Sequence, residues 1–348
     1  KLSLPAPMVL HPTGVRESRT PPAPTNHQPS PRAHRPGTRF FVCWVRRSKF
    51  GGPYTARSVS LCVVDYRLHD DPAEFAERAG ALFEADPVRH CIALPVLHTM
   101  LRGHGAAGEA PLLVSIAEGD RVIGAALQTP PAPLAVSAVP EACAGTLARA
   151  LREHGAAPEA VSGPREAVAA FVAAWRESGA GEATEAMSLR LHRLTTLREP
   201  SVPGELTFAD DGDVDVLARY RAALAVEALP PSSVTDHREA ARRSIAAGHA
   251  HGIWRVDGAP RSCAMATMPV CAMSRIGGVY TPPEYRGHGY GSAVTAGMAR
   301  WSLDQGAEHV LLFTDLANPV SNEIYRRIGF VPVHEAAEYR LTATTEGS

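Results

Sequence analysis

A glycine-rich loop at residues 285–291 is the feature that most constrains what this chain can be. The loop reads Tyr-Arg-Gly-His-Gly-Tyr-Gly and lies between a β-type run at 275–281, which ends at two prolines, and a helical pattern beginning near Tyr290. Its three glycines allow tight turns that point successive backbone N–H groups in one direction. A helix N-terminus behind them adds partial positive charge. The loop therefore predicts an anion cradle, with phosphate as its commonest occupant and Arg286 and His288 as further cationic contacts.

A second pattern lies downstream, at residues 318–330. Asn318 starts a predicted helix, Ser321 and Tyr325 lie on it, and Gly329 ends it before a phenylalanine. Asparagine, with proline after it, is typical of a first helical turn, and glycine of the position after the last turn. Each residue alone has an ordinary structural explanation as a cap or a packed side chain. The two patterns in this order are more specific than either one.

Together the two stretches resemble the GNAT superfamily of acyl-CoA N-acyltransferases. The first resembles its acetyl-CoA signature (Arg or Gln, two residues, Gly, one residue, Gly or Ala), filled here by Arg286, Gly289 and Gly291. The second resembles its Asn…Ala…Tyr…Gly-Phe motif, with Ser321 in place of alanine. The resemblance is specific over about residues 275–335. It implies an α/β fold with a mixed, mostly antiparallel central sheet flanked by helices.

The resemblance also implies roles for residues. Loop amides would hold the CoA pyrophosphate, and the preceding strand would pair with the pantetheine arm and orient the thioester. Tyr325 is the expected general acid, because attack of an amine on a thioester expels a thiolate that a phenol can protonate. We expect acetyl-CoA as co-substrate and no metal, since no histidine stands in a zinc-enzyme spacing. The expected cofactor-binding residues are Val279, Tyr280, Thr281, Arg286, Gly287, His288, Gly289, Tyr290, Gly291, Ser292 and Asn318.

The general base and the acceptor are less defined by the sequence. Glu227, late in a predicted helix, is the expected base, because this region often lines the acceptor site in the family; Asp315, Glu284 and a water chain are alternatives. Pro282 and Pro283 cannot donate to a strand ladder, and we expect them to help end pairing where the signature strand must leave its neighbour. A small amine, an amino acid, an antibiotic-like amine and a protein N-terminus all remain possible acceptors.

Composition excludes several classes of partner. Across 348 residues the formal net charge is −1, so neither nucleic acid nor a membrane surface is favoured as a partner. No apolar run is long enough to cross a bilayer. The six cysteines form no Cys-x-x-Cys pair, which favours a reducing, cytoplasmic setting. The oligomeric state is not readable.

The length fits two ordinary domains, and three regions differ in character. Residues 1–64 are rich in proline and arginine, and we expect a disordered or non-native extension; a tether to an acidic surface or a targeting peptide is the functional alternative. Residues 65–200 read as a degenerate GNAT-like domain, because 139–145 has neither the glycine spacing nor an arginine; an unrelated α/β domain is the alternative. Residues 201–348 read as the acetyltransferase domain, after a linker at 199–204.

Periodicity places the elements along both parts. Helices are expected over 72–83, 88–101 with a break at Pro95, 141–154, 167–175, 214–229, 235–249, 290–305 and 318–328. Strands are expected over 112–117, 122–127, 132–139, 187–194, 206–209, 252–256, 261–268, 275–281 and 310–314, and from 330 onward.

Two other functions fit parts of this pattern. The chain could be an inactive CoA-binding or interaction protein on a GNAT scaffold, but it retains both the loop and Tyr325. It could be a nucleotide-binding module, but it lacks the Lys-Ser/Thr of a P-loop and an acidic ribose-binding residue after a strand. The sequence therefore favours N-acetyl or short-acyl transfer to an amine.

Overall fold

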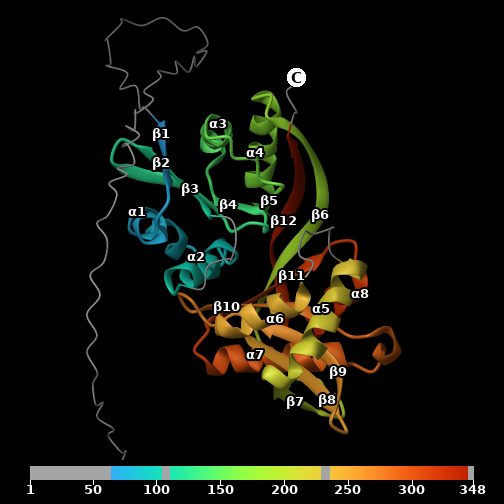
Figure 1. Ribbon diagram of the computed structural model, residues 1–348. Helices are drawn as coiled ribbons and strands as arrows, with labels where there is room; N and C mark the ends of the chain where they lie inside the picture. Colours follow the sequence, from blue (N-terminus) through green and yellow to red (C-terminus); the bar gives the residue numbers. More distant parts are fainter. Residues whose placement is uncertain (1–63, 104–109, 229–235, 344–348) are drawn as a thin grey trace, which may run out of the picture. The chain divides into compact units, whose positions relative to one another are not determined.

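The same succession of elements occurs twice along the chain in the computed structural model, which describes residues 64–103, 110–228 and 236–343 (Figure 1). The first half, residues 64–194, contains β1 (Val64–His69), α1 (Pro72–Glu84), α2 (Ala93–Leu101), β2 (Leu112–Glu118), β3 (Arg121–Gln128), β4 (Leu134–Ala138), the short 3-10 helix η1 (Glu141–Cys143), α3 (Ala144–Glu153), β5 (Ala160–Pro164), α4 (Arg165–Glu177) and β6 (Gly181–Leu194).

The second half, residues 205–343, repeats this order. It contains β7 (Glu205–Phe208), η2 (Asp211–Asp213), α5 (Val214–Ala228), α6 (His237–Ala246), β8 (Ala250–Val256), β9 (Ala259–Ala266), β10 (Met273–Tyr280), η3 (Pro283–Tyr285), α7 (Tyr290–Asp304), β11 (His309–Asp315), α8 (Pro319–Ile328) and β12 (Phe330–Ala343). All described residues lie within one compact unit, 41–348. The predicted extension at 1–64 falls almost entirely outside the described residues.

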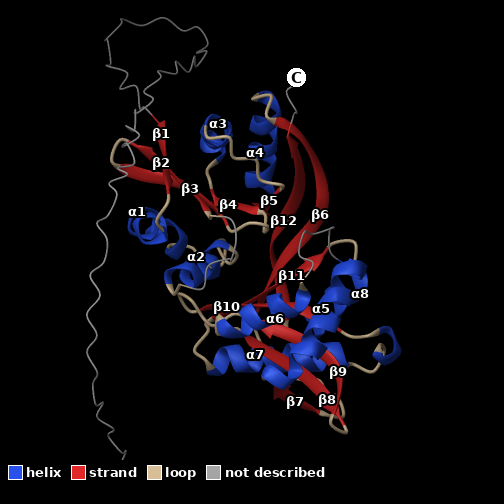
Figure 2. Cartoon of the chain, viewed as in Figure 1, coloured by secondary structure: helices blue, strands red, loops and turns tan. Residues whose placement is uncertain are grey.

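The strands of both halves form one sheet, in the order β1-β2-β3-β4-β5-β12-β6-β11-β10-β9-β8-β7. The last strand of each half is exchanged into the other half. Thus β6 pairs with β11, where His192 lies opposite Leu312, and β12 pairs with β5, where Tyr339 lies opposite Val161. The two long strands also pair with each other and run side by side through the centre of the sheet (Figure 2). The halves are therefore interlocked by main-chain hydrogen bonds.

Two strand pairs are parallel, β4 with β5 and β10 with β11, and all other pairs are antiparallel. The β10–β11 pairing runs only from Met273 opposite His309 to Ile276 opposite Leu312. Beyond it, β10 stays with β9 and β11 stays with β6, so the sheet opens between them. The β4–β5 pair separates in the same way after Ala135 and Ser162. Each half thus carries one opening in the sheet.

Helices cover both faces of the second half. On β9, Cys263 packs in a cluster with α5 and α6, whereas its neighbour Ala264 packs in a cluster with α7 and α8. This alternation follows from the two-residue period of a strand. The helices themselves begin where their caps predict: Asp236 accepts from the amide of Glu239, and Asn318 from that of Ser321.

The predicted fold class is confirmed: a mixed, mostly antiparallel sheet flanked by helices, present twice. Most predicted elements are found within a few residues of their expected ends. Among the described helices, none is both long and apolar enough to span a bilayer.

Several details of the sequence prediction were wrong. Helix α2 begins at Ala93, so Pro95 lies in its first turn, where a missing N–H costs nothing, and does not break a longer helix. Strand β5 was missed, because its sequence Ala-Val-Ser-Gly-Pro is short and ends in residues that strands disfavour. Strand β6 starts at Gly181, several residues before the predicted 187. The prolines do not separate β10 from β11: pairing ends at Ile276, well before Pro282, at a register shift that contains two glycines.

Candidate functional site

The glycine loop joins β10 to α7 beside the opening in the second half. Gly287 and Gly289 have φ of 81° and 83°, a left-handed conformation that favours glycine. Gly289 is the N-cap of α7, and a Cβ there would come within 3.0 Å of a methyl group of Val202. A Cβ on Gly291 would lie 3.2 Å from the hydroxyl of Thr281. Backbone conformation and space both require glycine at position 289.

Six successive amides of the loop, those of residues 287–292, donate no hydrogen bond to any residue that the structure describes. The first bond of the helix runs from the amide of Ala293 to the carbonyl of Gly289, at 3.0 Å. No side chain caps α7. Unpaired donors at a helix N-terminus form a site for an anion, and the helix dipole adds to it. Tyr290 and Ser292 lie in this first turn, and the His288 ring stacks on that of Tyr290 with centroids 5.5 Å apart.

The corresponding turn of the first half has no such donors at its centre. There η1 runs directly into α3, and the amides of Cys143 and Ala144 donate to the carbonyls of Pro140 and Glu141. These two N–H groups are therefore bonded to backbone carbonyls, whereas those of the glycine loop in the second half are unpaired among the described residues.

Three residues from separate elements meet beside the glycine loop. Tyr280, the last residue of β10, donates to Oε1 of Glu227 at 2.6 Å, and Arg286 donates from Nη2 to Oε2 at 2.5 Å. Nε of Arg286 also donates to the carbonyl of Thr281, at 2.9 Å. The hydrogen bonds from Tyr280 and from Arg286 lower the pKa of Glu227. Burial and the bond to Glu227 raise the pKa of Tyr280 to about 12.

The end of β10 is fixed by a serine that the sequence did not single out. Ser262 on β9 donates its hydroxyl to the carbonyl of Tyr280 at 2.9 Å, and the same hydroxyl lies 2.9 Å from Oγ1 of Thr281. Val279, one residue earlier, packs on the opposite face of the sheet, against the α7–α8 cluster. The strand residues that were predicted to face the thioester are thus held in place by neighbouring side chains.

Tyr325 lies apart from the Glu227 group. Its side chain packs among the residues between α7 and α8, with its ring 6.2 Å from that of Phe330, and only 9% of the residue is exposed. Burial raises the pKa of its phenol to about 12. Within the described part of the chain its hydroxyl has no hydrogen-bond partner. Glu227 belongs to the α5–α6 side, so the two predicted catalytic residues come from opposite faces of the sheet.

Helix α8 is tied to a strand of the first half through a chain of polar side chains. Thr314 on β11 donates to Oδ1 of Asn322 at 2.8 Å, and Nε2 of His192 on β6 lies 3.1 Å from the same hydroxyl. Nδ2 of Asn322 donates to the carbonyl of Asn318, at 2.8 Å. His192 and Thr314 are buried. Periodicity could not reveal His192, because it reaches this site only through the strand exchange.

The two other candidate bases lie outside α5. Glu284 is exposed in η3, and Asp315, at the end of β11, accepts from the amide of Ala317 at 2.8 Å. The carbonyl of Asp315 also accepts from the amide of Asn318, at 3.1 Å, but neither carboxylate is bonded to another predicted site residue in the described chain. Of the three carboxylates, Glu227 alone is joined to the glycine loop.

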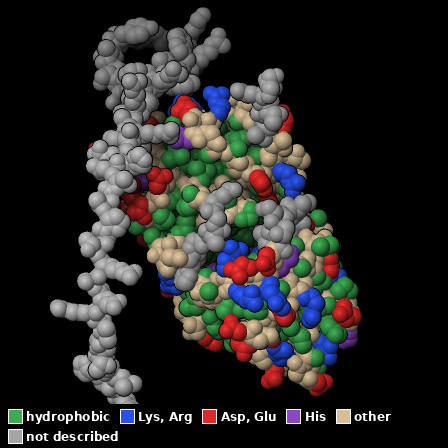
Figure 3. Space-filling view, viewed as in Figure 1, with side chains coloured by type: hydrophobic (Ala, Val, Ile, Leu, Met, Phe, Trp, Pro, Cys, Tyr) green, Lys and Arg blue, Asp and Glu red, His purple; other side chains and the backbone are tan. Residues whose placement is uncertain are grey.

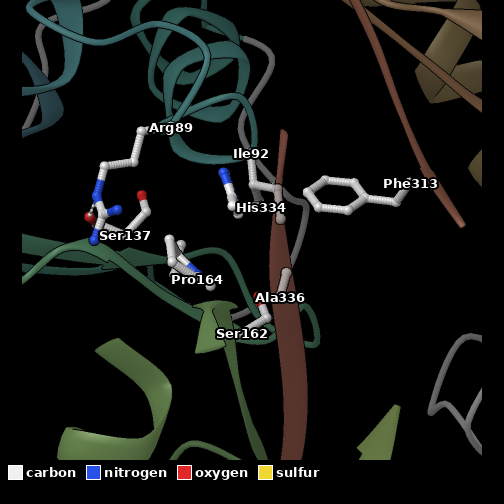
Figure 4. A pocket seen from close by; sticks show the side chains of 10 residues that line it. Arg89, Ile92, Ser137, Ser162, Pro164, Phe313, His334 and Ala336 are labelled. Atoms are coloured by element: carbon white, nitrogen blue, oxygen red, sulfur yellow. Dashed lines mark hydrogen bonds between the residues drawn. The ribbon is translucent and has the colours of Figure 1, made fainter. Parts of the chain in front are cut away.

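The opening in the sheet of the first half is lined by other kinds of side chain than the opening in the second half (Figure 4). A small pocket here is lined by Arg89, Ile92, Ala135, Ser137, Ser162, Gly163, Pro164, Phe313, His334 and Ala336. Arg89 donates from Nε to the carbonyl of Ser137 at 3.1 Å and pairs with Glu166 at 2.9 Å. Phe313 and His334 belong to the second half and line the opening from the other side.

Comparison with known proteins bears on the second half most directly. Residues 218–330 match the sequence model of the Acetyltransferase (GNAT) family. The chain is 27% identical over 150 residues to the aminoglycoside N(6')-acetyltransferase type 1 of Serratia marcescens, a match covering 39% of this chain and 98% of that protein.

Solved structures extend the likeness in fold across both halves. A tandem GNAT protein from the clavulanic acid biosynthesis pathway matches with a TM-score of 0.53 at 15% identity, covering 82% of this chain and all of that one. A GCN5-related N-acetyltransferase from Sphaerobacter thermophilus matches with a TM-score of 0.52 at 17% identity, covering 82% and 97% of the two chains. The match to the GNAT family thus covers residues 218–330, and the fold of the two halves resembles that of a tandem GNAT protein.

Proposed function

We propose that the second half transfers an acetyl, or another short acyl, group from acetyl-CoA directly to an amine. The observation that carries this proposal is the row of unpaired amides at residues 287–292, at the N-terminus of α7. These donors suit the pyrophosphate of CoA, and the opening beside β10 suits its thioester arm. No group in this assignment requires a metal.

Binding of CoA would change the partner of Arg286. In the free chain its guanidinium is paired with Glu227. The CoA pyrophosphate, which carries one negative charge on each phosphate, offers Arg286 a stronger acceptor. If Arg286 turns to that pyrophosphate, Glu227 loses one of the two hydrogen bonds that lower its pKa. Its carboxylate then becomes a better base for the incoming ammonium group, so cofactor binding would prepare the base.

Tyr325 would act on the leaving thiolate mainly as a hydrogen-bond donor. Its phenol has a pKa of about 12, whereas an ordinary thiol titrates near 8.5. Complete proton transfer in that environment is uphill by roughly 5 kcal/mol. A hydrogen bond from the protonated phenol still stabilises the developing negative charge on sulfur, and solvent completes the protonation.

For the acyl acceptor, we propose only its chemical class, an amine. The Serratia relative is an aminoglycoside acetyltransferase by name, so an aminoglycoside amine belongs in any screen. Acidic and basic side chains alternate over α5 and α6 (Figure 3), and Arg238 pairs with Asp215 there. This face gives no field of one sign that would select a polycation.

The division of labour between the halves is also proposed. Residues 65–200 would be a GNAT-like domain without a cradle, and residues 201–348 would carry the transfer site. We keep the cytoplasm as the expected compartment, because the described cysteines are free thiols.

Calorimetric titration of the full chain with acetyl-CoA and with CoA tests the proposal. We expect one site per chain, weakened at least a hundredfold by Gly289→Asp, which places a Cβ and a carboxylate in the cradle. Gly306→Ala is the matched control, since Gly306 has φ of 87° but nothing within 4 Å of an added Cβ. Its backbone penalty is similar, and its affinity should be unchanged.

A screen of amines by thiol release follows on the binding-competent chain. Release of CoA thiol with an amine, lost in Gly289→Asp, would support acyl transfer. Absence of acetyl-CoA binding by the parent chain would overturn the proposal. Binding without turnover on any amine class would instead favour a CoA-binding protein on a GNAT scaffold.

A further inference from the structure

A second cluster of chemistry-bearing side chains lies where the first half meets a turn of the second. Glu84 is the last residue of α1, His98 lies in α2, and Cys271 lies in the turn between β9 and β10. One carboxylate oxygen, one ring nitrogen and the sulfur all lie within 4.8 Å of one another. Three different kinds of metal ligand thus converge from three separate elements.

Each of these residues is adjacent in sequence to a member of one buried cluster. Phe83, Leu97 and Val270, together with Met273, belong to the same hydrophobic core. Figure 1 shows α1 and α2 on the side of the sheet where β10 begins. Because tight packing fixes the backbone on all three elements, side-chain rotation alone can adjust the distances among the three donors.

The turn that carries Cys271 is held on both sides. Val270 and Met273 exchange two backbone hydrogen bonds of 2.9 Å, and the two residues between them have φ of 47° and 56°. The carbonyl of Ala272 accepts from the amides of Glu308 and His309, at 2.8 and 2.9 Å. This geometry leaves Cys271 exposed, whereas the other described cysteines are buried.

We propose that Glu84, His98 and Cys271 bind a zinc ion that fastens the helices of the first half to the β9–β10 turn of the second. Zinc accepts thiolate, imidazole and carboxylate together, at about 2.0–2.3 Å from the metal. Tetrahedral bonds of that length place donors about 3.5 Å apart, roughly 1 Å closer than the upper limit found here. Thiolate ligation disfavours magnesium and calcium, which prefer oxygen donors.

The charge and proton balance of the site is simple. Zinc binding converts the Cys271 thiol to a thiolate and releases its proton to solvent. With Glu84 ionised and His98 neutral, the two negative ligands neutralise the metal charge. Both Glu84 and Cys271 are exposed, so water can fill the fourth position. The sequence prediction of no metal rested on local spacing, which cannot detect ligands brought together from distant parts of the chain.

Metal titration of the full chain without an affinity tag tests this site. For this experiment Cys43 and Cys62 are both replaced by serine. The thiols outside the described residues then cannot compete with Cys271 for the metal. Competition with a chromophoric chelator should give one zinc per chain with a sub-micromolar dissociation constant. Cobalt in place of zinc should give a thiolate-to-metal charge-transfer band in the near ultraviolet, and saturation with zinc should raise the melting temperature.

Two ligand variants and one control make the test specific. Cys271→Ser should abolish the charge-transfer band, and His98→Gln should weaken zinc binding at least tenfold. Glu77→Gln, which removes an exposed carboxylate from α1 two turns before Glu84, should change neither. Circular dichroism of each apo variant checks that it folds. The proposal is overturned by absence of stoichiometric binding in the parent, by a cobalt complex without the thiolate band, or by equal binding in Cys271→Ser.

Discussion

Arg286 donates a hydrogen bond from Nη2 to Oε2 of Glu227 at 2.5 Å, and this pair links the glycine loop to the end of α5. The cation expected to hold a CoA phosphate and the carboxylate expected to accept the amine proton therefore neutralise each other in the free chain. Both side chains are partly exposed, at 49% and 38%, so their attraction is moderated by water. We therefore expect Arg286 to exchange the carboxylate of Glu227 for a CoA phosphate when the cofactor binds.

Glu227→Gln distinguishes the expected role of this carboxylate as general base from its pairing with Arg286. We expect turnover to fall by about 10²-fold or more, as for loss of a general base. Acetyl-CoA affinity should be retained or rise a few-fold, because Arg286 is freed and a negative charge is removed. The pKa of Glu227 is lowered, so its basic form is present above that pKa and is lost as the pH falls through it. The acid limb of the rate profile should therefore disappear.

Thiol release measured across pH, alongside calorimetry, tests the Glu227 prediction. Glu284→Gln is the control for charge near the loop, since Glu284 is exposed in η3. Unchanged turnover and an unchanged acid limb in Glu227→Gln would remove Glu227 from the mechanism. A loss found only in Glu284→Gln would transfer the role to that residue.

Tyr325→Phe removes one oxygen from a buried ring and leaves the packing against Phe330 intact. We expect turnover to fall about 10- to 100-fold, at the lower end of proton-transfer catalysis, because the phenol acts mainly as a hydrogen-bond donor. The dissociation constant of CoA should stay within about threefold of the parent. Tyr339→Phe, which removes a phenol that donates to Glu185 on the neighbouring strand, is the control. Equal losses in affinity and turnover would point to a structural role.

Acid should destabilise the fold through two histidines, His90, which is buried, and His251, which is half-buried. Burial lowers the pKa of both His90 and His251 to about 4, from an unfolded value near 6.5. Because their folded pKa is depressed, the stabilisation they give is complete above 6.5 and is lost as the pH falls toward 4. Linkage gives a loss of about 2 kcal/mol for each by pH 5.

Urea unfolding at pH 7, 6 and 5 measures that loss. His90 lies 2.9 Å from the hydroxyl of Ser137, and His251 lies 2.9 Å from that of Ser244, so glutamine can keep a polar contact at either position. His90→Gln and His251→Gln should each flatten the pH dependence of the free energy of unfolding. If both variants keep the parent slope, other groups cause the acid sensitivity.

The sequence predicted local features well. The cap at Asn318, the turn at Asp257 and Gly258, and the start of α7 at Tyr290 follow from residue chemistry acting over a few positions. Strand exchange between the halves could not be predicted in this way. It depends on which strand edges meet in three dimensions, and residues at 181–194 give no sign of the partner they pair with.

The candidate site shows the same contrast between local features, which the sequence predicts, and tertiary contacts, which it does not. Arg286 and the glycines were found from spacing, because one loop carries them. The bond from Tyr280 to Glu227 joins residues far apart in the sequence, and the contact of His192 with Thr314 joins the two halves. Such contacts depend on the tertiary fold, so the sequence could name the candidates but not their partners.

The strand exchange predicts how the second half behaves when it is produced without the first half. A fragment of residues 201–348 lacks β6, so β11 loses one neighbour and β12 loses both β5 and β6. Unpaired strand edges of this length promote association. We expect no folded monomer: the fragment should aggregate, or form a dimer in which the β12 strands of two copies replace the missing exchange. Co-expression with residues 41–200 should restore a soluble one-to-one complex that binds acetyl-CoA as the full chain does. Light scattering and thermal unfolding of the purified fragment decide this, and a monomer that unfolds cooperatively would show that the exchange is not needed for folding.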